Sequence, residues 1–304
     1  MDGTYIPVVL EHLARSTRDR YKGIIKNYLK PQFGGLALRD VTVLTIERYL
    51  AGLSKGKLQH ESLDKVRDVL SSVMASTVKY GLLVKNPVEG VRLPHRKTGR
   101  KGKPWVTGDQ FRLLVQLIRE PYASMVYVAV YTGLRVSELV GLRWQNVHED
   151  SISIEQRYCR GDWGAPKSEA SNATIPVNQA VIRRIHQLKT MTVEVKAGSG
   201  VRRYKLVKTW GPDDLVFQSV RNSGPMRDNN ILVRHIKPAG RKIGLPFVNW
   251  RCLRTSYATW LKLGGADIKD AQGLLRHSRA STTLDIYQQF VPESQRRVVD
   301  RLVM

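Results

Sequence analysis

The residues of this chain that could do chemistry together are cations and one tyrosine, spread between positions 135 and 287. They are Arg135, Lys167, Arg254, His277 and Tyr287. Arg135 lies in TGLRVSELVGLRW, where a Gly-Leu-Arg turn leads into a predicted helix. The helix dipole disfavours a cation at that end. A cation there indicates an anion site, because backbone amides and a guanidinium group can hold an anion together.

Taken alone, several of these residues also have a purely structural interpretation. Arg135 could form a surface ion pair with Glu138, three residues later on the same helix. Lys167 in APKSEASNATIPV lies in the turn between two predicted strands, where a single lysine indicates only a solvated loop. A tyrosine such as Tyr287, in a short helical stretch, is most often a core or interface residue. Only their combination favours a functional site.

Arg254 is harder to explain as ordinary surface charge. It lies in RCLRTSYATW, a predicted helix with bulky apolar neighbours, and Arg251 precedes it by three residues. Side chains at this spacing lie close together on one side of a helix, so the two guanidinium groups project from nearly one face. Because the neighbouring residues are bulky and apolar, ordinary surface charge on an amphipathic helix is a weak explanation for Arg254.

The elements expected to position these residues begin with an all-α helical bundle over residues 1–93. Three helices are predicted in it: one capped by Ser16 or Thr17 and stopped by Pro31 and Gly34–Gly35, one over 44–53, and one over 62–80. Lys65 and Arg67 lie partly off the apolar stripe of the last helix, so both are candidate contacts to a polyanion.

A basic linker is predicted over residues 94–104. The stretch around it, LPHRKTGRKGKPW, has Pro and Gly near both ends and no apolar periodicity. Its cations are Arg96, Lys97, Arg100, Lys101 and Lys103. Two interpretations stand side by side: a solvated connection between domains, and a connection that also crosses a phosphate backbone.

Residues 105–304 predict a second domain that is mainly α with a small antiparallel β-sheet. The expected elements are a helix capped by the Thr107–Gln110 box, an apolar helix over 122–131 ending near Gly133, strands over 151–158 and 173–177, a helix over 178–190, a basic loop over 191–212, and further helices from 226 onward. Such a mixed domain can bring the separated cations together.

The composition narrows the classes of protein. The chain has 304 residues with 50 Lys and Arg against 26 Asp and Glu, a net charge of +24 that indicates a polyanionic partner. A hydrophobic content of 42% is that of a globular protein. No apolar run is long enough for a membrane span, and no secretory signal is apparent. Two cysteines, Cys159 and Cys252, provide neither a disulfide framework nor metal-ligand spacing, which favours a reducing compartment.

The order Arg…Lys…Arg-x-x-Arg…His…Tyr on a basic two-domain chain resembles the tyrosine recombinases, the lambda-type integrase family. The resemblance covers nearly the whole chain. TGLRVSEL resembles the family's first arginine box, PKSEASNATIPV its hairpin lysine pattern, LRTSYAT its second arginine box, and LLRHSRASTTLDIY its histidine–tyrosine box. It implies catalytic roles for Arg135, Lys167, Arg254, His277 and Tyr287, with Glu138 as the supporting acid.

The resemblance also implies a mechanism. Tyr287 would attack a DNA phosphodiester and hold the 3′-phosphate, so that neither ATP nor a metal or other cofactor is needed. Arg135 and Arg254 would clamp the non-bridging oxygens, with Arg251 assisting. Lys167 would protonate the departing 5′-oxygen, and His277 would donate a hydrogen bond to the phosphate.

The sequence departs from the family pattern at three positions. Arg251 stands where the family usually has histidine, Thr255 follows the second arginine where histidine is frequent, and Arg276 replaces the usual glycine of the third box. The first departure matters most, because an arginine stabilises phosphate charge but is a poor base.

The resemblance implies a C-shaped clamp on double-stranded DNA at specific recombination sites, and a homotetramer on synapsed DNA with accessory DNA-bending or directionality factors. Residues 292–304 predict an amphipathic helix that packs on its own domain or on a neighbouring protomer. No membrane partner is expected. The resemblance implies a place in the prokaryotic cytoplasm, in association with the nucleoid.

Two other functions remain open at this point. The departures at Arg251 and Arg276 are also consistent with a DNA-binding protein of the same fold whose catalysis is weakened. A DNA-relaxing enzyme like the type IB topoisomerases shares the covalent tyrosine chemistry but cleaves many sequences. A two-metal nuclease or transposase is disfavoured, because the 26 acidic residues form no evident carboxylate cluster.

Overall fold

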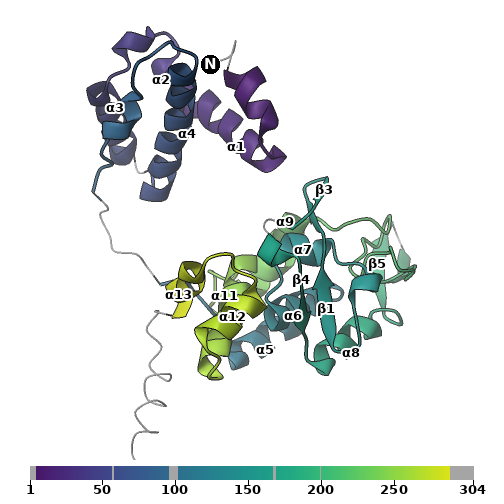
Figure 1. Cartoon of the computed structure of the whole chain (residues 1–304). Helices are drawn as coiled ribbons and strands as arrows, with labels where there is room; N and C mark the ends of the chain where they lie inside the picture. The colour runs from purple at the N-terminus through teal and green to yellow at the C-terminus, as the bar shows by residue number, and fades with distance from the viewer. Residues whose placement is uncertain (1–4, 57, 96–101, 167–168, 199, 288–304) are drawn as a thin grey trace, which may run out of the picture. The chain divides into compact units, whose positions relative to one another are not determined.

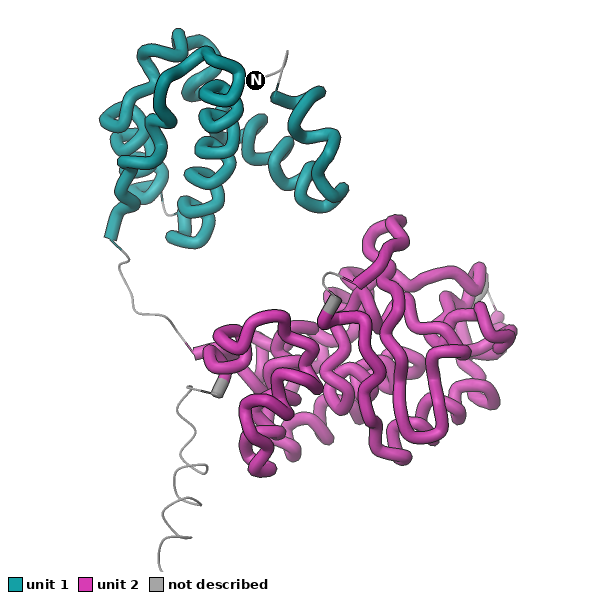
Figure 2. Tube along the Cα trace, in the orientation of Figure 1, with its two compact units in different colours: residues 1–100 teal, residues 101–304 magenta. Residues whose placement is uncertain are grey.

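The computed structural model describes residues 5–56, 58–95, 102–166, 169–198 and 200–287 (Figure 1). The chain divides into two compact units, residues 1–100 and 101–304, which Figure 2 draws in different colours. Each unit has a hydrophobic core of its own. The linker boundary at 94–104 stays a prediction, because 96–101 lie outside the described residues.

All secondary-structure elements assigned in the described part of the first unit are helices. Its α-helices are α1 (Arg15–Ile24), α2 (Lys30–Phe33), α3 (Val43–Lys55) and α4 (His60–Lys79) (Figure 1). Short π- or 3₁₀-helical turns occupy Tyr5–Val9, Leu10–His12, Ile25–Leu29, Leu38–Asp40 and Pro87–Gly90. The predicted helices over 44–53 and 62–80 are confirmed as α3 and α4, and the apolar stripe of α4 is buried as its spacing predicted.

The first helix differs from the prediction at both of its expected limits. α1 begins at Arg15, and the residue before it, Ala14, makes no side-chain cap. The helical path then continues through the π-helical turn Ile25–Leu29 into α2, so Pro31 does not stop it. Pro31 is in the first turn of α2, where a missing backbone N–H is best tolerated.

The second unit is mainly α, as expected. Its α-helices are α5 (Gly108–Gln116), α6 (Tyr122–Thr132), α7 (Val136–Val140), α8 (Gln179–Gln187), α9 (Asp228–Ile231), α10 (Lys237–Lys242), α11 (Trp250–Leu263), α12 (Ile268–Leu275) and α13 (Ala280–Tyr287). Its strands are β1 (Ser151–Ile154), β2 (Arg157–Cys159), β3 (Asp162–Gly164), β4 (Ala173–Pro176), β5 (Thr192–Ala197) and β6 (Gly200–Lys205). Short turns at Trp144–Asn146, Glu169–Ser171 and Leu232–Ile236 complete it.

The strands form three antiparallel pairs, β1–β4, β2–β3 and β5–β6. The β1–β4 pair confirms the two expected strands, and its register places Ile152 opposite Ile175, both buried. The stretch 151–158 forms two strands instead of one, because the chain leaves β1 after Ile154 and pairs again only from Arg157.

The expected loop over 191–212 is a wrong prediction for much of its length. It folds into the hairpin β5–β6, in which Thr192 pairs with Lys205 and Val195 with Arg202. Gly198 has a φ of +64°, the left-handed conformation that a tight turn requires of the backbone. The alternation in TVEVK, followed by Gly-Ser-Gly, was a hairpin signal that the basic composition obscured.

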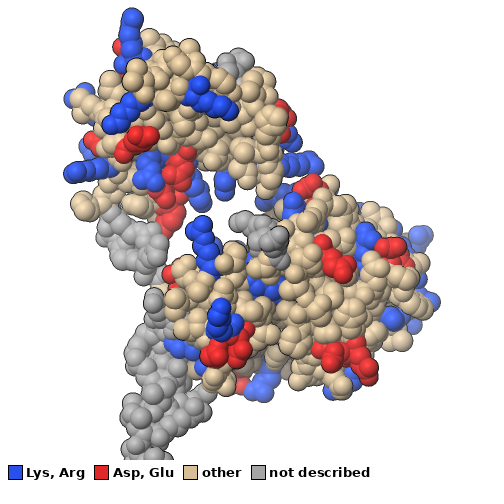
Figure 3. All heavy atoms as spheres, viewed as in Figure 1, with Lys and Arg blue, Asp and Glu red and all other residues tan. Residues whose placement is uncertain are grey.

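Basic side chains lie over both units. Figure 3 shows Lys and Arg on the visible face of each unit, with fewer Asp and Glu among them. Positive charge is therefore not confined to one half of the chain, which fits a polyanionic partner that contacts both.

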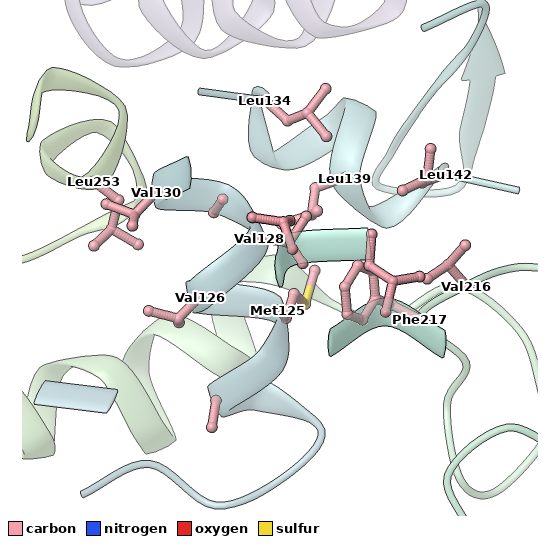
Figure 4. Packing of buried hydrophobic residues seen from close by; sticks show 14 of the residues in the cluster. Met125, Val126, Val128, Val130, Leu134, Leu139, Leu142, Val216, Phe217 and Leu253 are labelled. Atoms are coloured by element: carbon pink, nitrogen blue, oxygen red, sulfur yellow. The ribbon is translucent and has the colours of Figure 1, made fainter. Parts of the chain in front are cut away.

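Helix α6 is the centre of the second core. Its sequence, YASMVYVAVYT, contains no charged residue, and eight of its side chains are buried. Figure 4 shows Met125, Val126 and Val128 among apolar residues of other elements, including Leu139 of α7 and Leu253 of α11. Because α7 and α11 both pack on α6, this helix fixes the positions of Arg135, at the start of α7, and of Arg254, on α11.

Candidate active site

Arg135 is presented by a tight turn at the end of α6. Gly133 ends that helix with a φ of +60°, and Arg135 then stands at the N-cap of α7. A Cβ atom on Gly133 would lie 2.5 Å from the Tyr257 ring, so the turn requires glycine for space as well as for conformation. The Gly-Leu-Arg turn predicted from the sequence is confirmed.

Glu138 anchors Arg135 from inside the protein. Its side chain is only 3% exposed. Oε1 accepts a hydrogen bond of 2.7 Å from Nη1 of Arg135, and Oε2 accepts one of 2.8 Å from the Arg135 backbone N–H. Oε2 also accepts a 2.8 Å hydrogen bond from Nη2 of Arg276. The Arg135–Glu138 pair considered from the sequence therefore exists, but its carboxylate is buried and shared with a second arginine.

The loop before β4 adds a further contact to Arg135. Nη1 of Arg135 donates to Oγ of Ser171 at 3.0 Å, and Ser171 follows Lys167 by four residues. Nη2 donates to the backbone oxygen of Arg276 at 3.4 Å. Glu138, Ser171 and the end of α12 together hold the Arg135 guanidinium in one orientation.

Arg254 joins the same cluster from α11. Its Nη1 and Nη2 groups donate to the backbone oxygens of Gly133 and Leu275, so it bridges the α6–α7 turn and the end of α12. No carboxylate contacts Arg254 among the described residues. Burial, with the charges of Arg135 and Arg276, lowers the pKa of Arg254 to about 9. Mutually repelling guanidinium groups held this close favour the binding of an anion.

His277 lies at the edge of the arginine cluster. Its Nδ1 is 2.8 Å from Oγ1 of Thr283, which is fully buried. Burial and the charges of Arg254, Arg135 and Arg276 lower the pKa of His277 to about 4, so the ring is neutral at pH 7. When the Thr283 hydroxyl donates to Nδ1, the ring carries its proton on Nε2 and can donate it to an anion.

Replacing Glu138 with glutamine should destabilise the second unit. Burial raises the pKa of Glu138, but Arg276 and Arg135 outweigh it and hold the pKa below its usual 4.5. The variant leaves both guanidinium groups without their carboxylate, a loss of about 3–5 kcal/mol in the free energy of unfolding at pH 7. Urea unfolding followed by tryptophan fluorescence reports on this unit, because all 6 tryptophans lie within it.

The pH dependence provides the check on that result. A lowered carboxyl pKa stabilises the fold above the unfolded value, and this stability is lost as the pH falls through the folded value. The difference between wild type and Glu138→Gln should therefore shrink below about pH 4.5. Equal free energies of unfolding at pH 7 would contradict the buried ion pair.

The described part of the structure does not place three of the predicted residues in this cluster. Arg251 is exposed, and its side chain has no hydrogen bond or ion pair among the described residues. Lys167 lies outside the described residues, and Tyr287 is the last residue of α13, with its side chain outside the described part. Whether these three reach the site stays a prediction.

The predicted DNA contacts are only partly described. Lys65 is exposed on α4, whereas Arg67 forms ion pairs with Asp64 at 2.6 Å and Asp68 at 3.1 Å. Lys103 lies 3.5 Å from Asp285 of α13. The linker cations outside the described residues are Arg96, Lys97, Arg100 and Lys101.

Three contributors to the cluster had no role in the sequence interpretation: Ser171, Thr283 and the side chain of Arg276. Arg276 was noted only as a departure from glycine, yet its guanidinium is ion-paired with Glu138 and fully buried. The two threonines of the third box were visible as a pattern, but nothing in it indicated that Thr283 contacts His277. A buried partner from a distant segment leaves no local signal.

Among the described residues, no group of three or more His, Cys, Asp or Glu side chains could hold a metal ion. In the same part of the chain, no helix is long and apolar enough to cross a membrane. Neither Cys159 nor Cys252 forms a disulfide. Cys252 is buried, which raises the pKa of its thiol to about 11. The chemistry of the cluster is therefore that of guanidinium groups, an imidazole and a carboxylate.

Known proteins resemble this chain along most of its length. It is 24% identical to the integrase of Mycobacterium phage L5 over 274 residues, which cover 89% of this chain and 70% of that protein. The Tn1549 transposon integrase in complex with transposon right end DNA has the same fold, with a TM-score of 0.75 at 17% identity over 96% of this chain and 95% of that one. A lambda integrase tetramer bound to a Holliday junction gives a TM-score of 0.69 at 19% identity, covering 95% and 77%.

Two family models match the chain itself. The model of the phage integrase N-terminal SAM-like domain matches residues 4–54. The model of the phage integrase family matches residues 104–293, which include the whole arginine cluster and α13. With its four boxes in order and Arg135 joined to Arg276 through Glu138, the chain belongs to the phage integrase family of tyrosine recombinases.

Proposed function

We propose that this chain is a site-specific DNA recombinase in which Tyr287 cleaves a strand and holds it as a 3′-phosphotyrosyl intermediate. The observation that carries the proposal is the cluster in which Arg135 and Arg276 share the buried carboxylate of Glu138 and Arg254 bonds the backbone oxygens of Gly133 and Leu275. Family membership supports an enzyme that cleaves and rejoins DNA.

The charge of the cluster suits phosphoryl transfer. Three guanidinium groups and one carboxylate leave a net charge of +2 when all four are ionised. The scissile phosphodiester carries one negative charge and approaches two as the fifth bond to phosphorus forms. Arg135 and Arg254 stabilise that added charge, and they cost little reorganisation because their orientations are fixed in advance.

The reaction proceeds by exchange of one phosphorus–oxygen bond for another. The bond from Tyr287 Oη to phosphorus forms while the bond from phosphorus to O5′ breaks. Lys167 gives a proton to the departing O5′, and the phenol proton passes to solvent because Arg251 is a poor base. His277 donates from Nε2 to a non-bridging oxygen. Attack by a 5′-hydroxyl of a partner duplex reverses these steps and joins the new strand.

The two units divide the work in this proposal. Residues 1–93 serve as a core-DNA-binding domain and residues 105–304 as the catalytic domain, joined by the basic linker 94–104, and both domains bind double-stranded DNA. Lys65, Arg67 and the linker cations contact the phosphate backbone. The solved lambda tetramer on a Holliday junction supports a homotetramer on synapsed DNA. Accessory DNA-bending or directionality factors and a place at the prokaryotic nucleoid fit this activity.

The test is covalent trapping followed by mass spectrometry. Wild-type protein is incubated with labelled double-stranded fragments that flank its gene, denatured in SDS, and digested with trypsin and nuclease. The tryptic peptide over residues 280–296 contains Tyr287 as its single tyrosine. We expect that peptide to carry a nucleotide through a 3′-phosphate, at one preferred DNA site.

Other outcomes would select the alternative functions. Tight binding without an adduct, once the correct site has been offered, would indicate a DNA-binding protein with weakened catalysis. Adducts at many unrelated sequences, with relaxation of supercoiled plasmid, would indicate a type IB topoisomerase-like enzyme.

A further inference from the structure

The position of Arg276 is unfavourable for an arginine in two respects, its backbone conformation and its burial. It ends α12 with a φ of +53° and a ψ of +48°, the left-handed conformation that glycine adopts without strain. Its side chain is also fully buried, although it carries a charge. A residue kept against both local preferences points to a role that offsets these costs.

The contacts of Arg276 lead to the first arginine of the site. Nη2 donates to Oε2 of Glu138 at 2.8 Å, and Nη1 donates to the backbone oxygen of Leu274 at 3.1 Å. The same Glu138 oxygen accepts the backbone N–H of Arg135, and the other accepts Nη1 of Arg135. Glu138 therefore stands between the two guanidinium groups and links the end of α12 to the start of α7.

The charge of Arg276 determines how much positive charge Arg135 and Glu138 present together. Without Arg276, the single carboxylate of Glu138 would cancel the charge of Arg135. With Arg276 present, the three groups keep one positive charge, and Arg135 is the partly exposed member. Arg276 cannot bind the phosphate itself, because none of its side chain is exposed.

We propose that Arg276 is a positioning residue, which fixes Glu138 and offsets its charge so that Arg135 keeps both its orientation and its attraction for the scissile phosphate. This inference rests on the proposed function. It extends that function by giving a chain-specific task to the residue that replaces glycine in the third box. Nε of Arg276 is buried without a hydrogen-bond partner in the described structure, so the guanidinium is held by the contacts of Nη1 with Leu274 and of Nη2 with Glu138.

The test compares Arg276→Gly and Arg276→Lys by single-turnover cleavage of a trapping substrate at saturating protein. Arg276→Gly relieves the left-handed conformation and should keep the fold. We expect it to lower the cleavage rate about 10- to 100-fold, the usual range for a supporting partner, while DNA affinity stays within about twofold. Arg276→Lys keeps a cation near Glu138 and should recover part of the rate.

A merely structural residue would behave differently. If Arg276 only ended α12, glycine would serve at least as well, and lysine would restore nothing. A double variant with Glu138→Gln adds a second readout: the rate losses should be less than additive, because both changes remove the same link. Fully additive losses, or a wild-type rate in Arg276→Gly, would overturn the proposal.

The same experiment separates this proposal from the proposed function. A wild-type chain that forms no adduct at Tyr287 would refute the recombinase function and the Arg276 proposal together. A normal wild-type adduct with an unchanged rate in Arg276→Gly would refute the Arg276 proposal alone.

Discussion

A Tyr287→Phe variant should form no covalent DNA adduct while it binds its DNA site as tightly as the wild type. Phenylalanine keeps the ring and loses only the hydroxyl that would become bonded to phosphorus. Loss of a covalent nucleophile typically reduces turnover by about 10⁴-fold or more. Denaturation in SDS and electrophoresis of labelled DNA measure the adduct, and a filter or mobility assay measures the binding.

Tyr257→Phe is the matched control for that variant. Tyr257 lies on α11, and the charges of Arg254 and Arg276 act on its hydroxyl, which makes it a rival nucleophile at the cluster. Its ring packs over Gly133, and phenylalanine preserves that packing. Burial raises the pKa of the Tyr257 hydroxyl, so less of it is ionised at neutral pH. An adduct that survives in Tyr287→Phe but disappears in Tyr257→Phe would contradict the assignment.

Removal of the Arg254 side chain should give the second largest effect. Arg254→Ala loses the proposed phosphate ligand and also the bridge between the Gly133 and Leu275 backbone oxygens. We expect the single-turnover cleavage rate to fall about 10²- to 10³-fold, as for the loss of one preorganised donor. Arg254→Lys should recover little, because one ammonium group cannot reproduce a planar fork that spans two carbonyls.

The control for Arg254 is an exposed arginine of the same unit that lies outside the arginine cluster. Arg112 on α5 is exposed and paired with Asp109. Arg112→Ala removes the same charge from the chain and should leave the cleavage rate near that of the wild type. A similar loss in both variants would mean that Arg254 acts only through the general attraction of a basic protein for DNA.

Local signals in the sequence predicted much of the fold. The Thr107–Gln110 capping box is present at the start of α5, and the apolar helix over 122–131 ends at the left-handed Gly133. Caps and helix periodicity depend on residues a few positions apart, which one sequence displays directly. The hairpin β5–β6 was missed because adjacent arginines, Arg202 and Arg203, interrupt the alternation in its exposed second strand.

The sequence predicted which residues belong to the site but not which of them contact one another. The boxes gave Arg135, Arg254 and His277, and the structure brings these three together. The sharing of Glu138 between Arg135 and Arg276 joins segments 138 residues apart. The burial of a cation depends on such tertiary contacts, and no periodicity or spacing records them.

The large sequence separation of these contacts also determines when the arginine cluster can form during protein synthesis. Gly133 meets Arg254 across 121 residues of sequence, and Glu138 meets Arg276 across 138. Contacts of such separation form only after the intervening chain has been made and packed. The helical bundle leaves the ribosome long before α12 and α13 do. A half-made chain therefore lacks the assembled arginine cluster, and the ability to cut DNA is acquired last.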